Sequence, residues 1–214
     1  MNLEVRRIDS KTAMEIVTQR HYLKRRCNCI EAFGLFVEGQ EQGSLINDGI
    51  LKGVIVFGKP ASFTLCNGVC GPDESRNVAE FNRLWVCDSM PKNTESQFVA
   101  AALRQSRFQI IVSFADIQQG HVGYIYQATN WLYTGQSAAT RYFKPKTSEA
   151  AGGVQYSRRK RMTKAAIIEQ HGADMVDEYW SSPKHRYIFF NAPQKRRKQL
   201  IKKLRYPVLP YPKK

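Results

Sequence analysis

The amino-acid sequence predicts a mixed α/β fold, in which helices flank a central sheet and a basic extension follows. Short apolar runs that fit strands alternate with stretches whose apolar residues recur at helical spacing. The clearest strand is residues 110–114, a nearly continuous apolar run typical of a strand covered on both faces. A chain of 214 residues with 43% hydrophobic residues can bury a sizeable core. We therefore expect one domain over residues 1–190 and a basic, proline-containing tail over residues 191–214.

The first half of the chain predicts four strands and two helices. Residues 3–8 alternate as a strand, and Asp9 or Ser10 can cap a helix over residues 11–19. Strands follow at residues 30–37, 51–57 and 79–87, with a polar loop at 38–48 and an irregular stretch at 61–79. A helix over about residues 95–105 begins at Asn93 or Thr94.

The second half begins with the buried strand and a predicted helix over residues 120–132. That helix is indicated by spacings of three and four residues between Val122, Ile125, Thr129 and Leu132. Further strands are predicted at residues 138–143, 156–162 and 187–190, and a capped helix at 163–170. Residues 192–214 predict a basic helix followed by an extended, proline-rich segment.

The charge of the chain is concentrated near its carboxyl end. The net charge is +15, but residues 1–140 carry 14 Lys and Arg against 13 Asp and Glu, whereas residues 141–214 carry 19 against 5. Such a block is either a solvated basic surface or, as we favour, a surface for a polyanion such as nucleic acid. The basic runs lack the broad apolar face that a membrane surface requires. No apolar run approaches a membrane span and the N-terminus lacks a signal-peptide core, so we expect a cytoplasmic protein.

Five cysteines occur without a secretion signal, so we expect them to be reduced thiols. Cys27 and Cys29 are separated by one residue, and Cys66 and Cys70 by three. Those spacings are unlike the usual zinc ribbons and fingers, which makes ordinary buried thiols the better interpretation.

Ionisable side chains gather where the buried strand meets the next helix. Asp116 follows the strand directly, at the edge where ligands bind in open α/β sheets, and His121, Tyr124 and Tyr126 come soon after. The polar members of the strand over residues 79–87 are Glu80, Asn82 and Arg83, which either face a site or lie on an outward surface.

The element order resembles the N-acetyltransferase (GNAT) architecture. Residues 126–135, YQATNWLYTG, resemble a segment of that superfamily's fourth helix, and the resemblance makes Tyr126 a general acid. In a GNAT, a glycine-rich loop precedes the helix that corresponds to residues 93–105 here. The backbone amides of that loop cradle the coenzyme A pyrophosphate at the helix N-terminus. Here residues 88–97 contain no glycine, which argues against ordinary acetyl-coenzyme A binding, and Ser96 and Gln97 are the candidate cofactor contacts.

A fuller pattern resembles the Mom family of phage DNA-modification proteins. Four segments carry this resemblance: His21-Tyr22-Leu23, residues 80–84 (EFNRL), residues 113–116 (SFAD) and residues 120–135. The resemblance as a whole covers roughly residues 10–190. The resemblance implies an iron-dependent enzyme that converts adenine N6 in double-stranded DNA to N6-carbamoylmethyladenine and so protects phage DNA from restriction. The positions that match the family's functional residues are His21, Tyr22, Asp116 and Tyr126.

The iron that the resemblance implies needs nitrogen and carboxylate ligands with open positions. His21, Glu80 and Asp116 could supply them, with His121 as a fourth candidate. Asp116 could instead be a general base, with Tyr126 as the acid. The sequence does not separate these two roles.

Reaching N6 in duplex DNA requires an extruded base, on which Tyr22, Tyr124, Trp131 or Tyr133 could stack. Two other functions stay open: a coenzyme A-dependent N-acyltransferase, and a DNA-binding protein without catalysis. The oligomeric state is also open, with a homodimer as one option.

Overall fold

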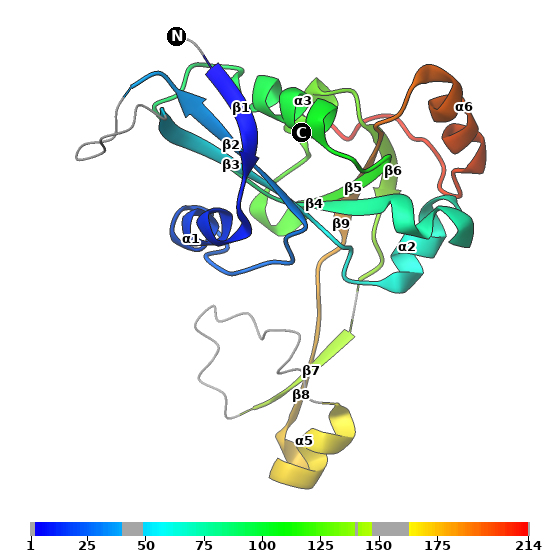
Figure 1. Cartoon of the computed structure of the whole chain (residues 1–214). Helices are drawn as coiled ribbons and strands as arrows, with labels where there is room; N and C mark the ends of the chain where they lie inside the picture. The colour runs from blue at the N-terminus through cyan, green and yellow to red at the C-terminus, as the bar shows by residue number, and fades with distance from the viewer. Residues whose placement is uncertain (1–2, 40–48, 140, 147–162, 214) are drawn as a thin grey trace. The chain divides into compact units, whose positions relative to one another are not determined.

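The computed structural model describes residues 3–39, 49–139, 141–146 and 163–213 (Figure 1). The chain divides into two compact units. The first unit comprises Met1–Ala115, Val122–Gly135 and His185–Lys214, and the second comprises residues 116–121 and 136–184.

The elements follow one another in a largely alternating order. The strands are β1 (Leu3–Ile8), β2 (Glu31–Val37), β3 (Ile50–Gly58), β4 (Val78–Val86), β5 (Ile110–Asp116), β6 (Leu132–Gln136), β7 (Arg141–Pro145), β8 (Val176–Trp180) and β9 (Lys184–Phe190). The helices are α1 (Ser10–Arg20), α2 (Phe63–Cys70), α3 (Thr94–Gln105), α4 (Tyr124–Ala128), α5 (Lys164–His171) and α6 (Gln194–Lys203). Short 3₁₀ helices lie at Pro72–Asn77, Ile117–Gln119 and Ala173–Met175.

The main sheet has seven strands in the order β1-β2-β3-β4-β5-β9-β6. Strands β1 to β4 pair antiparallel, and β4 pairs parallel with β5. The parallel pairing is short, because its last registered pair is Glu80 with Val112. The β3–β4 register also shifts between Val56 and Phe57, where Asn82 has no partner in the register. Beyond Glu80 the two central strands are therefore no longer paired, and this opening positions the site.

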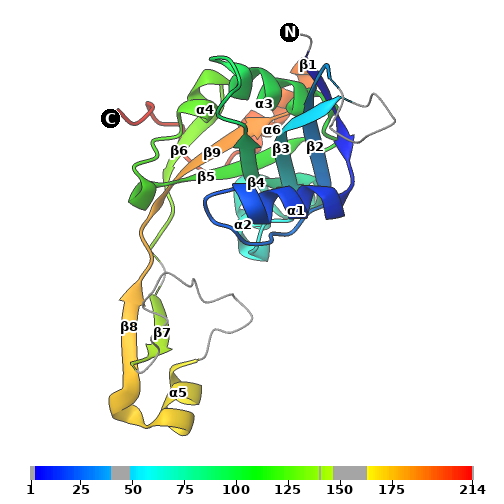
Figure 2. The ribbon, with the colours of Figure 1, turned by 90° about the vertical axis from the view of Figure 1, so that its left-hand side faces the viewer.

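Helices cover the two faces of the sheet (Figure 2). On one face, buried residues of α3 and α4 pack with Phe57, Phe81 and Ile111. On the opposite face, α1 packs on Val54 and Val56, while α2 and α6 pack on Val78, Ile110 and Val112. The mixed α/β sheet flanked by helices that the sequence predicts is confirmed.

The second unit is built on a two-stranded sheet. β7 and β8 pair antiparallel, from Arg141 with Trp180 to Pro145 with Val176. Thr163 caps α5 by accepting a hydrogen bond from the Ala166 amide, as the sequence predicts, and Ile167 of α5 is fully buried.

The stretch at residues 61–79 is not irregular, which corrects the prediction. Ser62 caps α2 through the amide of Leu65, and Cys66, Val69 and Cys70 lie at helical spacing in the core. The turn-forming Gly71 and Pro72 mark only the end of this helix. Burial raises the pKa of the Cys70 thiol to about 11, as expected for a structural thiol.

The helix predicted over residues 120–132 is also wrong in its extent. α4 ends at Ala128, Asn130 adopts a left-handed conformation with φ 60, and Leu132 begins β6. Asparagine tolerates that conformation, and the apolar spacing continues only by coincidence into the strand. Strands β6 and β8 were not predicted, and the strand predicted at residues 138–143 lies at Arg141–Pro145. The strand predicted at residues 156–162 and most of the loop at 38–48 lie outside the described residues.

The carboxyl end is a helix followed by an extended segment, as predicted. Two hydrogen bonds attach this extended segment to the rest of the first unit. The Leu209 amide donates to the Tyr133 carbonyl at 2.9 Å, and the Tyr211 hydroxyl donates to the Trp131 carbonyl at 2.7 Å.

Candidate active site

The opening between β4 and β5 contains a buried tyrosine and a buried serine. The Tyr126 hydroxyl, from α4, lies 2.7 Å from Oγ of Ser113 on β5, and Ser113 Oγ lies 3.0 Å from the Phe81 carbonyl of β4. Ser113 Oγ can donate to the Tyr126 hydroxyl or to the Phe81 carbonyl, and because a serine hydroxyl has one proton it serves one acceptor at a time. The Tyr126 phenol oxygen is therefore hydrogen-bonded within the protein.

Burial keeps the phenolic proton of Tyr126 in place. Tyr126 is only 9% exposed, and burial raises the pKa of its phenol. The hydrogen bond with Ser113 works in the opposite direction, while nearby Tyr22 and Glu80 raise the pKa further. Tyr126 is thus protonated across the physiological pH range, with Tyr22 and Glu80 in its electrostatic surroundings.

Aromatic rings fix the orientation of Tyr126. Its ring centroid lies 5.0 Å from Tyr187, 5.1 Å from Trp131 and 6.0 Å from Phe81. The Tyr187 hydroxyl donates to the Val122 carbonyl. Gly123 has φ +81, and a Cβ there would lie 2.5 Å from the Tyr187 ring, so only glycine fits between them.

His21 and Tyr22 lie in the loop that follows α1. Their ring centroids are 4.4 Å apart, with His21 buried and Tyr22 51% exposed. The Leu23 amide donates to His21 Nδ1 at 3.1 Å, so a neutral His21 carries its proton on Nε2.

This loop is anchored to the sheet at Asn28. Oδ1 of Asn28 accepts from the Lys59 amide at 2.7 Å, and its carbonyl accepts from Nδ2 of Asn82 at 2.8 Å. Gly58 permits the approach, because a Cβ there would lie 2.2 Å from the Asn28 carbonyl oxygen. The bulged Asn82 of β4 therefore holds the segment that carries His21 and Tyr22.

Asp116 and His121 belong to the second unit. Asp116 Oδ2 lies 2.9 Å from Nζ of Lys184, and Oδ1 accepts from the Gln118 amide at 3.1 Å. The His121 amide donates to the Asp116 carbonyl at 3.1 Å. Lys184 was missed by the sequence reasoning because its distance of 68 residues from Asp116 hides the pairing.

The proposed iron ligands are distributed over both units, with His21 and Glu80 in the first and Asp116 in the second. Across the part of the chain that the structure describes, no three His, Cys, Asp or Glu side chains form a group that could hold a metal ion. The described residues therefore do not present a three-ligand set, and the ligand assignment stays a prediction.

The four aromatic candidates for stacking on a base differ in accessibility. Trp131 is fully buried, and Tyr133 is buried with its hydroxyl 2.9 Å from His185 Nδ1. Tyr124 is 58% exposed and Tyr22 is 51% exposed. Of the four candidates, Tyr22 and Tyr124 are therefore the ones accessible enough to stack on an extruded base.

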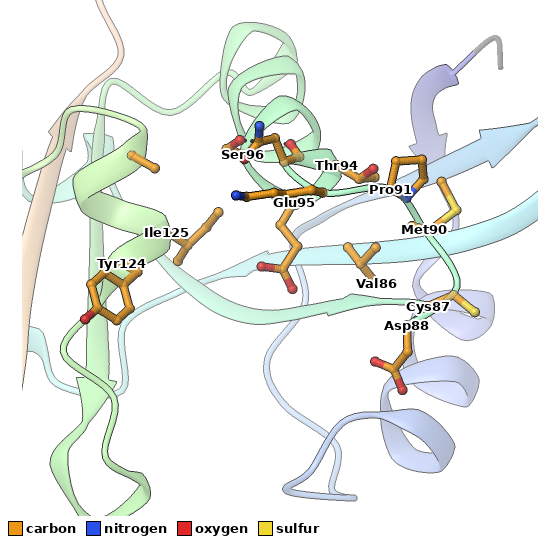
Figure 3. A pocket seen from close by; sticks show the side chains of 13 residues that line it. Val86, Cys87, Asp88, Met90, Pro91, Thr94, Glu95, Ser96, Tyr124 and Ile125 are labelled. Atoms are coloured by element: carbon orange, nitrogen blue, oxygen red, sulfur yellow. Dashed lines mark hydrogen bonds between the residues drawn. The ribbon is translucent and has the colours of Figure 1, made fainter.

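An open pocket of about 330 Å³ lies between the end of β4, the start of α3 and α4 (Figure 3). Ser96 lines it, but its hydroxyl donates to the Asn93 carbonyl at 2.9 Å, and Gln97 is not among the lining residues. Asp88, Lys92 and Glu95 also line the pocket. Figure 3 shows the Glu95 carboxylate in the space between Tyr124 and Val86. The anion-binding end of α3 thus already carries its own carboxylate.

Fold and site together define an α/β protein whose sheet opens at a buried tyrosine–serine pair. The chain belongs to the Mom protein family, whose model matches residues 2–213. The methylcarbamoylase Mom of Escherichia phage Mu is 30% identical over 146 residues, which are 65% of this chain and 56% of that protein. The chain thus aligns with little more than half of that relative's length.

Several solved acetyltransferases are similar in structure. YncA of Salmonella typhimurium, a putative acetyltransferase solved with acetyl-CoA, has 12% identity and a TM-score of 0.47, covering 91% of this chain and 96% of its own. The spermidine/spermine N-acetyltransferase SpeG of Vibrio cholerae, in complex with manganese, has 9% identity and a TM-score of 0.45 over the same shares, 91% and 96%. Among the described residues, no helix is long and apolar enough to cross a membrane.

Proposed function

We propose that this chain is a transferase that modifies adenine N6 in double-stranded DNA to N6-carbamoylmethyladenine. In a phage-infected cell this reaction would take place in the host cytoplasm and hide the phage genome from restriction enzymes. The carrying observation is the buried Tyr126–Ser113 pair at the opening of the sheet, in a chain of the Mom family. The similarity to the methylcarbamoylase Mom of phage Mu supports the reaction class.

The exposed Tyr22 supplies a surface for an extruded adenine. Base flipping costs a few kcal/mol, and stacking of the extruded base on an aromatic face, which suits any base, would offset part of this cost by about 1–3 kcal/mol. His21 lies against Tyr22 and Asn28 anchors their loop, so the stacking ring would be positioned before the base arrives.

Tyr126 would hold a proton rather than shuttle one. Its raised pKa makes it a weak acid, and its hydrogen-bond chain ends at a backbone carbonyl that has no proton to pass on. Tyr126 would therefore keep its proton and act as a hydrogen-bond donor that is fixed in position. Asp116 would act as the base that takes the N6 proton or as a ligand.

Iron is part of this proposal through the family resemblance. His21, Glu80 and Asp116 would hold it and leave positions open for chemistry. The described residues do not assemble this set, so the roles given to the other residues do not depend on it.

A coenzyme A-dependent N-acyltransferase is the second candidate, because the pocket lies at the start of α3. The carboxylates of Asp88 and Glu95 would repel the diphosphate of coenzyme A, which weakens this candidate. A DNA-binding protein without catalysis would not need the buried Tyr126–Ser113 pair.

Mass spectrometry of nucleosides from plasmid DNA tests the proposal. DNA from cells that express the chain should contain N6-carbamoylmethyladenine, and DNA from cells that express Tyr126→Phe should contain much less. Unmodified adenine throughout, in cells that accumulate folded protein, would overturn the proposal. Tight binding of acetyl-coenzyme A in calorimetry, with acetyl transfer to an amine, would favour the second candidate.

A further inference from the structure

Helix α6 carries six Lys and Arg side chains in ten residues and no acidic one. No Asp or Glu follows Glu178 in the sequence. A concentration of one charge sign on a single short helix calls for a partner of opposite sign, either within the protein or outside it.

Part of this charge is neutralised within the protein. Glu74 is buried, and its carboxylate accepts hydrogen bonds from Arg196 and from Lys203, the latter at 2.7 Å. Leu200, on the same side of the helix, is fully buried beneath α2 and the sheet. This side of α6 is therefore the one that attaches the helix to the first unit.

Three other lysines lie on a different face of the helix. Lys195, Lys198 and Lys202 are separated by three and four residues, which places them in one row. All three are exposed, and they form no ion pair or hydrogen bond with the described part of the chain. We call this row the lysine face.

The lysine face matches the charge spacing of a duplex. Seven residues of helix extend over about 10 Å, a length over which double-stranded DNA carries about six phosphate charges. The face is also fixed in place, since the Arg205 amide donates to the Val69 carbonyl at 2.9 Å directly after the helix. A broad apolar stripe for a lipid surface is absent from the helix as described, where Ile201 is the exposed large hydrophobic residue.

We propose that the lysine face binds the phosphate backbone of duplex DNA, without reading its sequence. This inference rests on the proposed function for its choice of partner, and it assigns a binding surface that lies outside the candidate active site. Three lysine contacts would displace counterions from the duplex and hold the substrate, while base recognition would occur elsewhere.

The salt dependence of DNA binding tests the proposal with matched variants. Lys195→Gln/Lys202→Gln removes two charges from the lysine face, and Lys11→Gln/Arg104→Gln removes two exposed charges from α1 and α3. Fluorescence anisotropy with an unmodified duplex at several salt concentrations gives the slope of log K against log salt. We expect the lysine-face variant to lose about 1.8 from the magnitude of that slope, and the control to lose much less. Adding Lys198→Gln should remove about 0.9 more.

Equal slopes in the two double variants, with both helices folded by circular dichroism, would overturn the proposal. The proposal would also be overturned if the lysine-face variant lost binding to anionic lipid vesicles while its binding to DNA stayed unchanged. Nucleoside analysis separates this inference from the proposed function. A reduced slope with no modified adenine would support the lysine face and reject the reaction, whereas modified adenine with unchanged slopes would do the reverse.

Discussion

Nζ of Lys184 lies 2.9 Å from Oδ2 of Asp116, so the first residue of β9 is ion-paired with the last residue of β5. The other carboxylate oxygen of Asp116 accepts the Gln118 amide. Both carboxylate oxygens of Asp116 are therefore held in a defined orientation. Asp116 is the acid to which the family resemblance gives a functional role.

Lys184→Gln should reduce adenine modification about tenfold or more, because partners that orient a functional carboxylate have effects of that size. The Lys184 side chain is 41% exposed, so the free energy of unfolding should change by less than about 1 kcal/mol. Quantitative nucleoside mass spectrometry measures the first effect and urea denaturation the second. Lys164→Gln, an exposed lysine of the same unit, is the control and should modify DNA normally. Full activity of Lys184→Gln would show that Asp116 works without this partner.

Removing either partner of the Tyr126–Ser113 pair should lower modification, with different costs in stability. Tyr126→Phe leaves Ser113 bonded to the Phe81 carbonyl, so we expect a loss of about 1 kcal/mol. Ser113→Ala leaves two buried groups unpaired, and each such group costs about 1–3 kcal/mol. Urea denaturation should therefore rank Ser113→Ala as the less stable variant. Tyr124→Phe, at an exposed tyrosine, should retain activity and stability, and a fully active Tyr126→Phe would remove Tyr126 from the mechanism.

The sequence predicts the fold well where the pattern is local. Asp9 caps α1 and Thr163 caps α5, since a capping side chain and its amide partners lie within three residues. The prediction fails at residues 120–132, where the left-handed Asn130 ends the regular structure although the apolar spacing continues. Spacing alone does not encode such a turn.

The residues of the candidate site also divide into those that the sequence predicts and those that only the structure reveals. Tyr126 and Asp116 stand out in the sequence because they follow a buried strand, and the family motifs carry them. Lys184 and Asn28 are ordinary residues in the sequence, and only the pairing of distant segments gives them roles. Burial also eliminates Trp131 and Tyr133 as stacking surfaces, which composition cannot do.

Asn82→Ala should loosen the loop that carries His21 and Tyr22. The Asn82 amide bonds to the Asn28 carbonyl in an exposed setting, so the loss of stability should stay below about 1 kcal/mol. Modification should fall, and hydrogen exchange of the Lys24 amide, which bonds to the His21 carbonyl, should accelerate. Asn82→Asp keeps the shape but cannot donate this hydrogen bond, so it should behave like Asn82→Ala. Unchanged exchange in both variants would mean that the loop is held by other contacts.

Glu74 should control the stability of α6 as a function of pH. Hydrogen bonds from Arg196, together with those from Lys203 and Asn77, lower the pKa of Glu74 to about 2 although burial opposes the shift. Because the folded pKa lies below the unfolded one of about 4.3, the stabilisation is present above pH 4.3 and is lost as the pH falls toward 2.

Glu74→Gln should therefore reduce the free energy of unfolding by roughly 2 kcal/mol at pH 7, after allowance for the partly exposed Lys203. The difference between wild type and variant should shrink as the pH is lowered from about 4 to about 2, where the wild-type carboxylate also loses its charge. Urea denaturation at several pH values measures it, and Glu15→Gln, at an exposed carboxylate in the middle of α1, should match wild type throughout. A difference that is constant with pH would mean that the Glu74 charge does not hold α6, and that Leu200 and the packing beneath the helix suffice.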